Sequence, residues 1–318
     1  MNNDNIGAMR RDRIDITVHR AEILKDTSIG GIFFFCALLS VLITFGIVII
    51  LLKDTAGFFK EVSIIEFFTH TRWSPTIKPV EFGVLPLISG TFIFTFVTSA
   101  IALPVGLLTA VFLSEYANER THSVLKPALE ILAGIPTVVY GYFALVYVTP
   151  FLRRIVPQIS TFNVLSAGIV VAIMIIPTIA SISEDAMRAV PKSLREAGLA
   201  LGVSEFRVTI TVVIPAALSG IVSSFILGIS RVIGETMAVT IAAGNLSRIV
   251  NPFNISDALL NPIQTMTAAM VEIGLSDVSG HSVAYKSLFA VGFTLFIMTF
   301  SLNLISQYIK YKFREKYL

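Results

Sequence analysis

The sequence predicts an all-α integral membrane protein with six transmembrane helices. Apolar side chains make up 54% of its 318 residues and charged ones only 14%, whereas soluble domains carry roughly 25% charged residues. The mean hydropathy is +0.80. Uncharged runs of at least 22 residues are long enough to cross the hydrocarbon core as helices. There are six of them: 27–52, 82–114, 131–152, 155–183, 208–230 and 287–309.

The first run, 27–52, predicts a retained transmembrane helix. Its 26 residues exceed the roughly 7–15 apolar residues of a signal peptide, and no small-residue cleavage site follows it. We expect residues 1–26 to form a polar N-terminal arm and 53–81 an extracytoplasmic segment. The region 82–309 then forms the membrane core, and 310–318 a short tail.

The distribution of Lys and Arg predicts that both termini are cytoplasmic. With the N-terminus inside, the inside segments hold 15 cationic residues and the outside segments 8, as the positive-inside rule requires. The net charge of +3 therefore follows from topology and requires no nucleic-acid partner. The basic residues of the arm are expected to contact anionic membrane lipid: Arg10, Arg11, Arg13, Arg20 and Lys25.

Two of the runs contain residues that weaken a helix. The run 82–114 has 33 residues and includes Pro86 and Pro104, which predict a tilted or broken helix. The run 131–152 carries Gly134 and Pro136, tolerated in membranes where neighbours satisfy the freed backbone groups.

The loop 184–215 alternates in charge and predicts two short helices on the cytoplasmic side. Pro191 is suited to start a helix at its first position, and Gly202 to end one. An apolar ridge of Leu194, Ala197 and Leu201 with a charged rim would suit a docking surface. The alternative is an ordinary solvated, charged face.

The outside segment 242–286 is long and rich in turn formers, among them Asn245, Asn251-Pro252, Asn261-Pro262 and Gly280. It offers a surface for a soluble partner on the outer face. A simple connector between two helices explains it equally well.

The fifth run predicts a close-packed face that also carries charge. Gly220, Ser224 and Gly228 recur every four residues, a spacing that lets membrane helices approach closely. At about 100° per residue, Arg231 and Glu235 fall on the same face if the helix continues. Both charges would then point into the protein.

An Arg at the bilayer centre costs about 2.5–3.5 kcal/mol on insertion scales, so it needs a reason. One reading is a self-satisfied ion pair between Arg231 and Glu235 that fixes helix packing. The other is an anion pathway, because a guanidinium offers planar donors to tetrahedral oxyanions and Glu235 would neutralise it when no anion is present. Thr236, Asn245 and the hydroxyls of 82–114 would add neutral donors.

The loop 184–215 resembles the EAA loop of ATP-binding-cassette importer permeases. That likeness rests on Glu196, Ala197, Gly198 and Gly202, followed nine residues later by Val-Val-Ile-Pro ending at Pro215. Gly198 replaces the second alanine of the pattern. The resemblance implies a type I importer (MetI-like) permease fold, in which these residues dock onto an ATPase subunit.

A second resemblance concerns residues 231–240, Arg-Val-Ile-Gly-Glu-Thr-Met-Ala-Val-Thr, which are similar to the signature of PstC-type permeases of phosphate importers. Matching stretches include 82–91, 113–117 and 134–141. The resemblance implies that 82–309 is a permease core for inorganic phosphate in a bacterial or archaeal cytoplasmic membrane. It also implies roles for Arg231 and Glu235 in phosphate passage.

The partners that this resemblance implies are a PstA-like sister permease, two copies of the ATPase and an extracytoplasmic phosphate-binding protein. The sequence has no Gly-x4-Gly-Lys-Ser/Thr phosphate-binding loop, so we expect a partner to use the ATP and this chain to bind no cofactor. No catalytic group and no metal-ligand spacing is evident.

Two alternatives stay open at this point. The same architecture would suit another oxyanion, such as molybdate, sulfate or phosphonate. A proton-coupled secondary transporter would use Glu235 as its proton carrier, although such a protein has no use for an EAA-type loop.

Overall fold

The computed structural model describes residues 3–312, which are helical over most of their length. The chain forms two units, Met1–Asp54 and Thr55–Leu318. Five of the described helical segments are long and apolar enough to cross a membrane, and a bent pair makes six if it counts as one span. The five are Ile29–Phe58, Leu85–Tyr116, Val164–Arg188, Glu205–Ile233 and Val283–Tyr308.

The first unit is one helix, α1 (Asn3–Phe58), whose last turn belongs to the second unit. The predicted boundary between the arm 1–26 and the span 27–52 is not a break in the helix, which also continues six residues beyond 52. From residue 29 to 52, large apolar side chains such as Phe34 are exposed on its surface. A helix that is apolar on every side is suited to a lipid environment.

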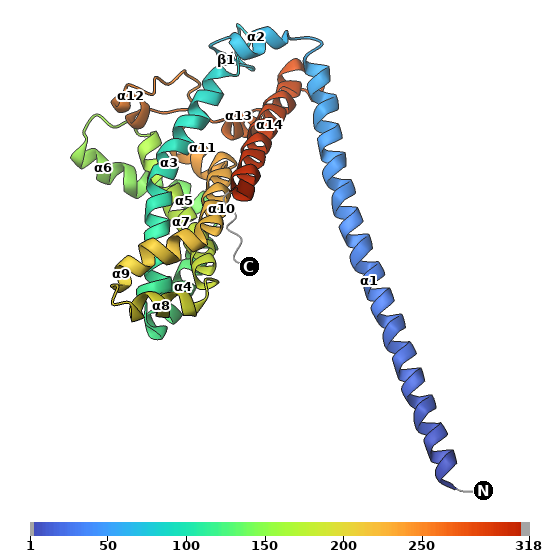
Figure 1. The fold of residues 1–318 in the computed structure, drawn as a ribbon. Coiled ribbons are helices and arrows are strands. Elements are labelled where there is room, and N and C mark those ends of the chain that lie inside the picture. The colour runs from blue at the N-terminus through green and yellow to red at the C-terminus, as the bar shows by residue number, and fades with distance from the viewer. Residues whose placement is uncertain (1–2, 313–318) are drawn as a thin grey trace. The chain divides into compact units, whose positions relative to one another are not determined.

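The centre of the second unit is a set of long helices, α3 (Leu85–Val111), α7 (Val164–Arg188), α10 (Ile214–Ile233) and α14 (Val283–Lys312). Helix α7 packs against α3 and α10, and α10 also packs against α3 and α14 (Figure 1). Two π-helical turns lengthen these spans. The turn η1 (Phe112–Tyr116) follows α3, and η3 (Thr209–Val213) joins α9 (Glu205–Val208) to α10.

The predicted third span, 131–152, is wrong as a single helix. The chain instead forms α4 (Glu119–Ala133) and, after a bend of 90°, a continuous helical segment Thr137–Ile155. That segment comprises α5 (Thr137–Phe143), the π-helical turn η2 (Ala144–Val148) and α6 (Thr149–Ile155). The bend falls at Gly134, Ile135 and Pro136, because a proline disfavours helical geometry in the residue before it.

The predicted span 155–183 is displaced toward the C-terminus. Helix α7 begins at Val164, where the Asn163 side chain accepts a hydrogen bond from the Ser166 amide at 2.7 Å and caps the first turn. It continues past 183, where the buried Glu184 carboxylate is paired with Lys126 and Arg188. Pro191 disfavours helical geometry at the preceding Val190 and occupies the N-cap position of α8 (Lys192–Ala200), rather than forming its first residue.

The segment before α3 folds into a small apolar cap. Helix α2 (Ile64–Thr69) is followed by strands β1 (Trp73–Ser74) and β2 (Glu81–Phe82), paired antiparallel with Trp73 opposite Phe82. Edge-to-face contacts join Phe82 to Phe58 and Trp73. Within the second unit, α2 and β1 lie at one end, and α4, α8 and α9 at the other (Figure 1).

The segment 242–286 is only partly the surface connector that its turn formers predict. It includes the end of α11 (Met237–Ala242), then α12 (Ile255–Leu260) and α13 (Met266–Leu275). Helix α13 packs against α3 and α14, and its residues Met266, Ala268 and Ala269 are fully buried. This short apolar helix therefore belongs to the core.

Candidate functional site

The candidate substrate site lies where the chain breaks between α10 and α11. Helix α10 ends at Ile233, and Gly234 caps it with a hydrogen bond from its amide to the Ser230 carbonyl at 3.2 Å. Thr236 is the residue before α11, and its hydroxyl donates to the Gly234 carbonyl at 3.1 Å. The Arg-x-x-Gly-Glu-Thr stretch thus forms a helix end, a turn and a new helix start.

Arg231 occupies the last turn of α10, and its side chain is exposed in this chain. Its Nη1 donates to the Thr178 hydroxyl of α7 at 3.2 Å. A guanidinium has five N–H donors, and within the described residues its remaining donors have no protein acceptor. Arg231 is therefore available to an anion.

Glu235 is 8% exposed and lies beneath this turn. Its carboxylate Oε1 accepts from the amide of Ala238 at 3.2 Å, which places a negative charge on the first turn of α11. Its backbone carbonyl accepts from the Thr267 hydroxyl of α13 at 2.8 Å. Helix α13 thereby fixes the position of the break.

The expectation that Arg231 and Glu235 share one helix face is wrong. It assumed that the helix continues to residue 235, but α10 ends two residues earlier, so the regular rotation per residue no longer applies. The described side chains contain no ion pair between these two residues. The self-satisfied pair is therefore not the arrangement in this structure.

The small residues of α10 lie against α7. A Cβ atom on Gly220 would overlap the Cβ of Ala186, and one on Gly228 would lie 3.0 Å from side-chain carbons of Ile179. Between them, the Ser224 and Ser183 hydroxyl oxygens are 2.6 Å apart. This close contact holds α10, and with it Arg231, beside Thr178.

A similar contact aligns the opposite side of the break. Gly141 of α5 has Ala238 Cα and Ile241 Cβ of α11 only 3.0 Å from where its own Cβ would be. A larger residue here would push α11 away from the bent pair. Gly141 is therefore a packing contact between α5 and α11.

The hydroxyls of α3 divide into two groups. Ser89 and Thr91 are hydrogen-bonded, with Thr91 accepting from the Met266 amide at 3.0 Å. The hydroxyls of Thr95, Thr98 and Ser99 are buried and have no partner among the described residues. Asn245, the other neutral donor considered, is exposed on the segment after α11.

The loop 184–215 contains two helices, as predicted: α8 and α9. Glu196, Ala197 and Gly198 lie in α8, and Gly202 ends it with a left-handed backbone, φ +74°. Pro215 is the second residue of α10.

Gly198 has a clear packing reason. A Cβ at this position would lie 2.8 Å from Cγ2 of Val208 in α9, so the two short helices could not keep their present distance. The replacement of alanine by glycine in the EAA pattern therefore matches the size of Val208.

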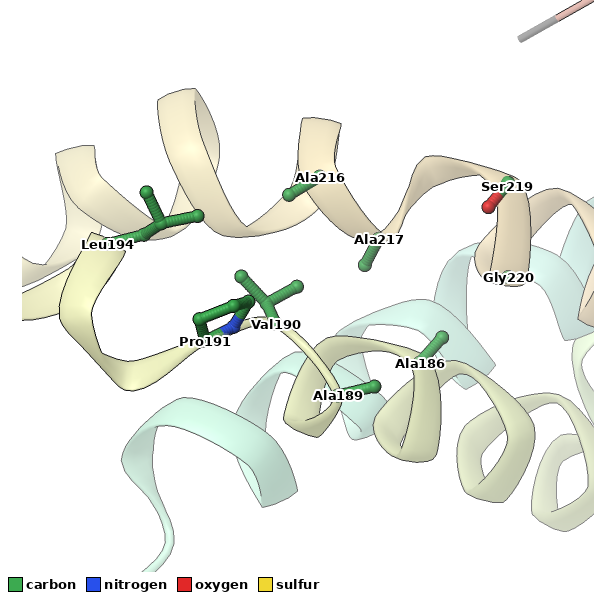
Figure 2. A pocket seen from close by; sticks show the side chains of 9 residues that line it. All are labelled: Ala186, Ala189, Val190, Pro191, Leu194, Ala216, Ala217, Ser219 and Gly220. Carbon is green, nitrogen blue, oxygen red and sulfur yellow. The ribbon is translucent and has the colours of Figure 1, made fainter. Parts of the chain in front are cut away.

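The predicted apolar ridge of Leu194, Ala197 and Leu201 is not one surface. Leu194 packs toward α10 and lines a mostly apolar cavity of 420 Å³ between the end of α7 and α10 (Figure 2). Leu201 follows α8 and is 83% exposed. Its exposed apolar neighbours in the loop are Leu199 and Phe206.

Two groups of ion pairs near α8 were not predicted from the sequence. The carboxylate of Glu184 is fully buried and contacts His122 Nε2 at 2.7 Å, Lys126 Nζ at 3.2 Å and Arg188 Nε at 2.9 Å. Arg195 of α8 contacts Glu115 of η1 at 3.0 Å. An acidic residue directly after a long apolar run was the available signal for Glu184.

The segment that follows α11 has its own charged contact. Arg248 Nη1 and Asp257 Oδ2 are 2.5 Å apart, and Arg248 also donates to the Asp257 and Pro262 carbonyls. The hydrogen bond and charge of Arg248, helped by a hydrogen bond from Asn261, hold the pKa of Asp257 below its usual value, although burial acts to raise it. This contact fixes the segment between α11 and α12.

Together these features define a class of protein: a multi-pass membrane transport subunit with a cation at a helix break and an exposed two-helix loop at one end. Residues 102–315 match the family described as "Binding-protein-dependent transport system inner membrane component", and the chain belongs to this family. It is a transport permease, in agreement with the predicted non-enzymatic role.

Individual relatives narrow the family. The probable ABC transporter permease protein YqgH of Bacillus subtilis is 35% identical over 278 residues, which cover 86% of this chain and 87% of that protein. The phosphate transport system permease protein PstC of Xylella fastidiosa is 34% identical over 272 residues, which cover 79% of this chain and 80% of that protein. The predicted resemblance to PstC-type permeases is confirmed.

Solved structures of transporters also resemble the fold of this chain. The crystal structure of a bacterial ABC transporter involved in alginate import aligns with a TM-score of 0.61 and 13% identity, covering 89% of this chain and 96% of that one. At this identity the likeness shows the fold alone. The predicted type I importer permease fold is confirmed.

Proposed function

We propose that this chain is the permease subunit of an ATP-driven importer that moves inorganic phosphate into the cell. The observation that carries the proposal is Arg231 beside the break between α10 and α11, within a chain 34% identical to a phosphate transport permease. Arg suits this task because its planar donors match the oxygens of a tetrahedral oxyanion.

The geometry favours an anion at Arg231 over a structural ion pair. Thr178 takes one N–H of the guanidinium, and the carboxylate of Glu235 is occupied by the Ala238 amide instead. An unpaired cation within a span is costly and is expected to serve a substrate or ion pathway. Thr236 and Glu235 would line the same pathway from the turn that follows.

The excess of cationic residues in the inside segments favours cytoplasmic termini and a cytoplasmic α8. The loop of Glu196, Ala197, Gly198, Gly202 and Pro215 would dock onto one of two ATPase copies, which hydrolyse the ATP. A PstA-like sister permease would cover the exposed side of Arg231, and an extracytoplasmic binding protein would deliver phosphate.

ATP-dependent uptake of labelled phosphate into vesicles tests this proposal. The vesicles contain the ATPase, the sister permease and the binding protein together with wild type, Arg231→Gln or Arg154→Gln. Arg154 is an exposed arginine in the last turn of α6, so it is a matched control for loss of one guanidinium.

We expect uptake that requires ATP in wild type and in Arg154→Gln, and loss of uptake in Arg231→Gln although the complex still assembles. Full uptake by Arg231→Gln would overturn the role of this residue. Uptake driven by a proton gradient without ATP would overturn the class of transporter. ATP-driven uptake of molybdate, sulfate or phosphonate, but not of phosphate, would overturn the substrate.

A further inference from the structure

Helix α8 is attached to the membrane helices through one arginine. Arg195 Nε and Nη2 donate to Oε2 and Oε1 of Glu115, both at 3.0 Å, in a bidentate ion pair. The side chains are 20% and 7% exposed, so the pair is largely shielded from water. Glu115 lies in η1, the π-helical extension of α3, and the Ser114 hydroxyl donates to it at 2.6 Å.

The same guanidinium also caps α7. Its Nη1 donates to the Val190 carbonyl at 2.7 Å and its Nη2 to the Met187 carbonyl at 2.8 Å. These carbonyls lie at the end of α7, where backbone acceptors lack helical partners and a positive charge is favourable. One side chain therefore joins α8 to both α3 and α7.

A lysine could not make this set of contacts. Its ammonium is a point charge without the planar fork that binds both carboxylate oxygens, and it would have to choose between the carboxylate and the two carbonyls. The arrangement needs a guanidinium in particular, and not only a positive charge.

The Arg195–Glu115 pair lies where a force on the exposed surface of α8 would reach the membrane helices. Glu196, the next residue, is exposed, as are Leu199 and Leu201. Arg195 is on the inner side of α8, between this surface and the spans. A displacement of α8 by a bound partner must therefore act on η1 and on the end of α7, and α7 carries Thr178, the acceptor for Arg231.

We propose that Arg195 and Glu115 are the positioning pair that transmits movement of α8 to α3 and α7. This inference rests on the proposed function, because it assumes an ATPase at α8 and phosphate at Arg231. Its consequence is that weakening the pair separates ATP hydrolysis from transport while the subunits remain together.

The test uses the complete complex in lipid vesicles with Arg195→Lys, Glu115→Gln and the control Arg154→Lys. Three quantities are measured: co-purification of the ATPase, ATP hydrolysis, and labelled phosphate transported per ATP hydrolysed. We expect Arg195→Lys to retain the ATPase and to go on hydrolysing ATP, with transport per ATP reduced about tenfold, within the usual range of coupling between sites. Glu115→Gln is expected to act in the same direction and the control to match wild type.

Several results would overturn the proposal. Transport per ATP equal to wild type in both Arg195→Lys and Glu115→Gln would show that the pair transmits nothing. Loss of assembly in both variants would assign the pair a purely structural role. The wild-type complex separates this inference from the proposed function, because a wild type that transports no phosphate with ATP contradicts the function itself.

Discussion

The contact between Gly220 and Ala186 leads to a quantitative prediction about the stability of the second unit. A Cβ added at Gly220 meets another Cβ, and the Cα of Ala186 lies behind it at 3.5 Å, so only separation of α10 from α7 relieves the overlap. Overpacking costs typically 1–3 kcal/mol, and we take about 3 kcal/mol here. Alanine regains about 1 kcal/mol of helix propensity over glycine. Gly220→Ala should therefore lower the free energy of unfolding by about 2 kcal/mol, roughly a 30-fold change in the unfolding equilibrium.

Gly228→Ala is the matched control on the same helix. Its added Cβ would lie 3.0 Å from Cδ1 and Cγ1 of Ile179, a milder contact than the overlap at Gly220, so about 1 kcal/mol of strain is offset by the propensity gain. Unfolding in mixed micelles, followed by far-UV circular dichroism, measures both variants. The double variant Gly220→Ala/Ala186→Gly should recover most of the loss. The reasoning is refuted if Gly220→Ala is as stable as Gly228→Ala, or if the double variant is no better than the single one.

Because the pKa of Asp257 is lowered beside Arg248, the pair contributes stability that is present above the unfolded pKa of about 3.9 and is lost as pH falls through the folded pKa. Asp257→Asn should therefore weaken the acid dependence of the melting temperature, and an unchanged acid dependence would contradict this. Gly202→Ala places a Cβ in a left-handed backbone and should cost about 1–2 kcal/mol, with Gly202→Asn milder; equal stability of the two variants by thermal unfolding would count against it. Glu184→Gln removes the buried carboxylate that Lys126 and Arg188 contact; because both cations are partly exposed to water, it should cost about 1–3 kcal/mol in chemical unfolding, and unchanged stability would contradict this.

The spans were predictable because long uncharged runs leave few alternatives to membrane helices. The exact ends of these helices were less predictable, since hydropathy does not report helix capping. Helix α7 continues to Arg188 because the buried Glu184 is paired with Lys126 of α4, about sixty residues earlier in the sequence. Pro136 was visible as a helix-weakening residue, but hydropathy alone did not show that the chain turns by 90° there.

The candidate site shows the same division. The residue types of the Arg-x-x-Gly-Glu-Thr stretch were evident, and so was the close-packing face of α10. The separation of Arg231 from Glu235 was not, because it depends on the end of α10 at Gly234 and on Thr267, which lies 32 residues beyond Glu235. Helix α13 was missed as a core element because its ten residues are too few for a span.

The contact between Gly198 and Val208 restricts which loops can be exchanged between permeases of this family. The EAA pattern has alanine at the position of Gly198, and here the space for that methyl group is filled by Val208. A chimera whose α8 is taken from a permease with alanine at this position also needs a smaller residue at position 208. Otherwise α8 and α9 will separate. In the design of hybrid transporters, positions 198 and 208 should therefore be exchanged together.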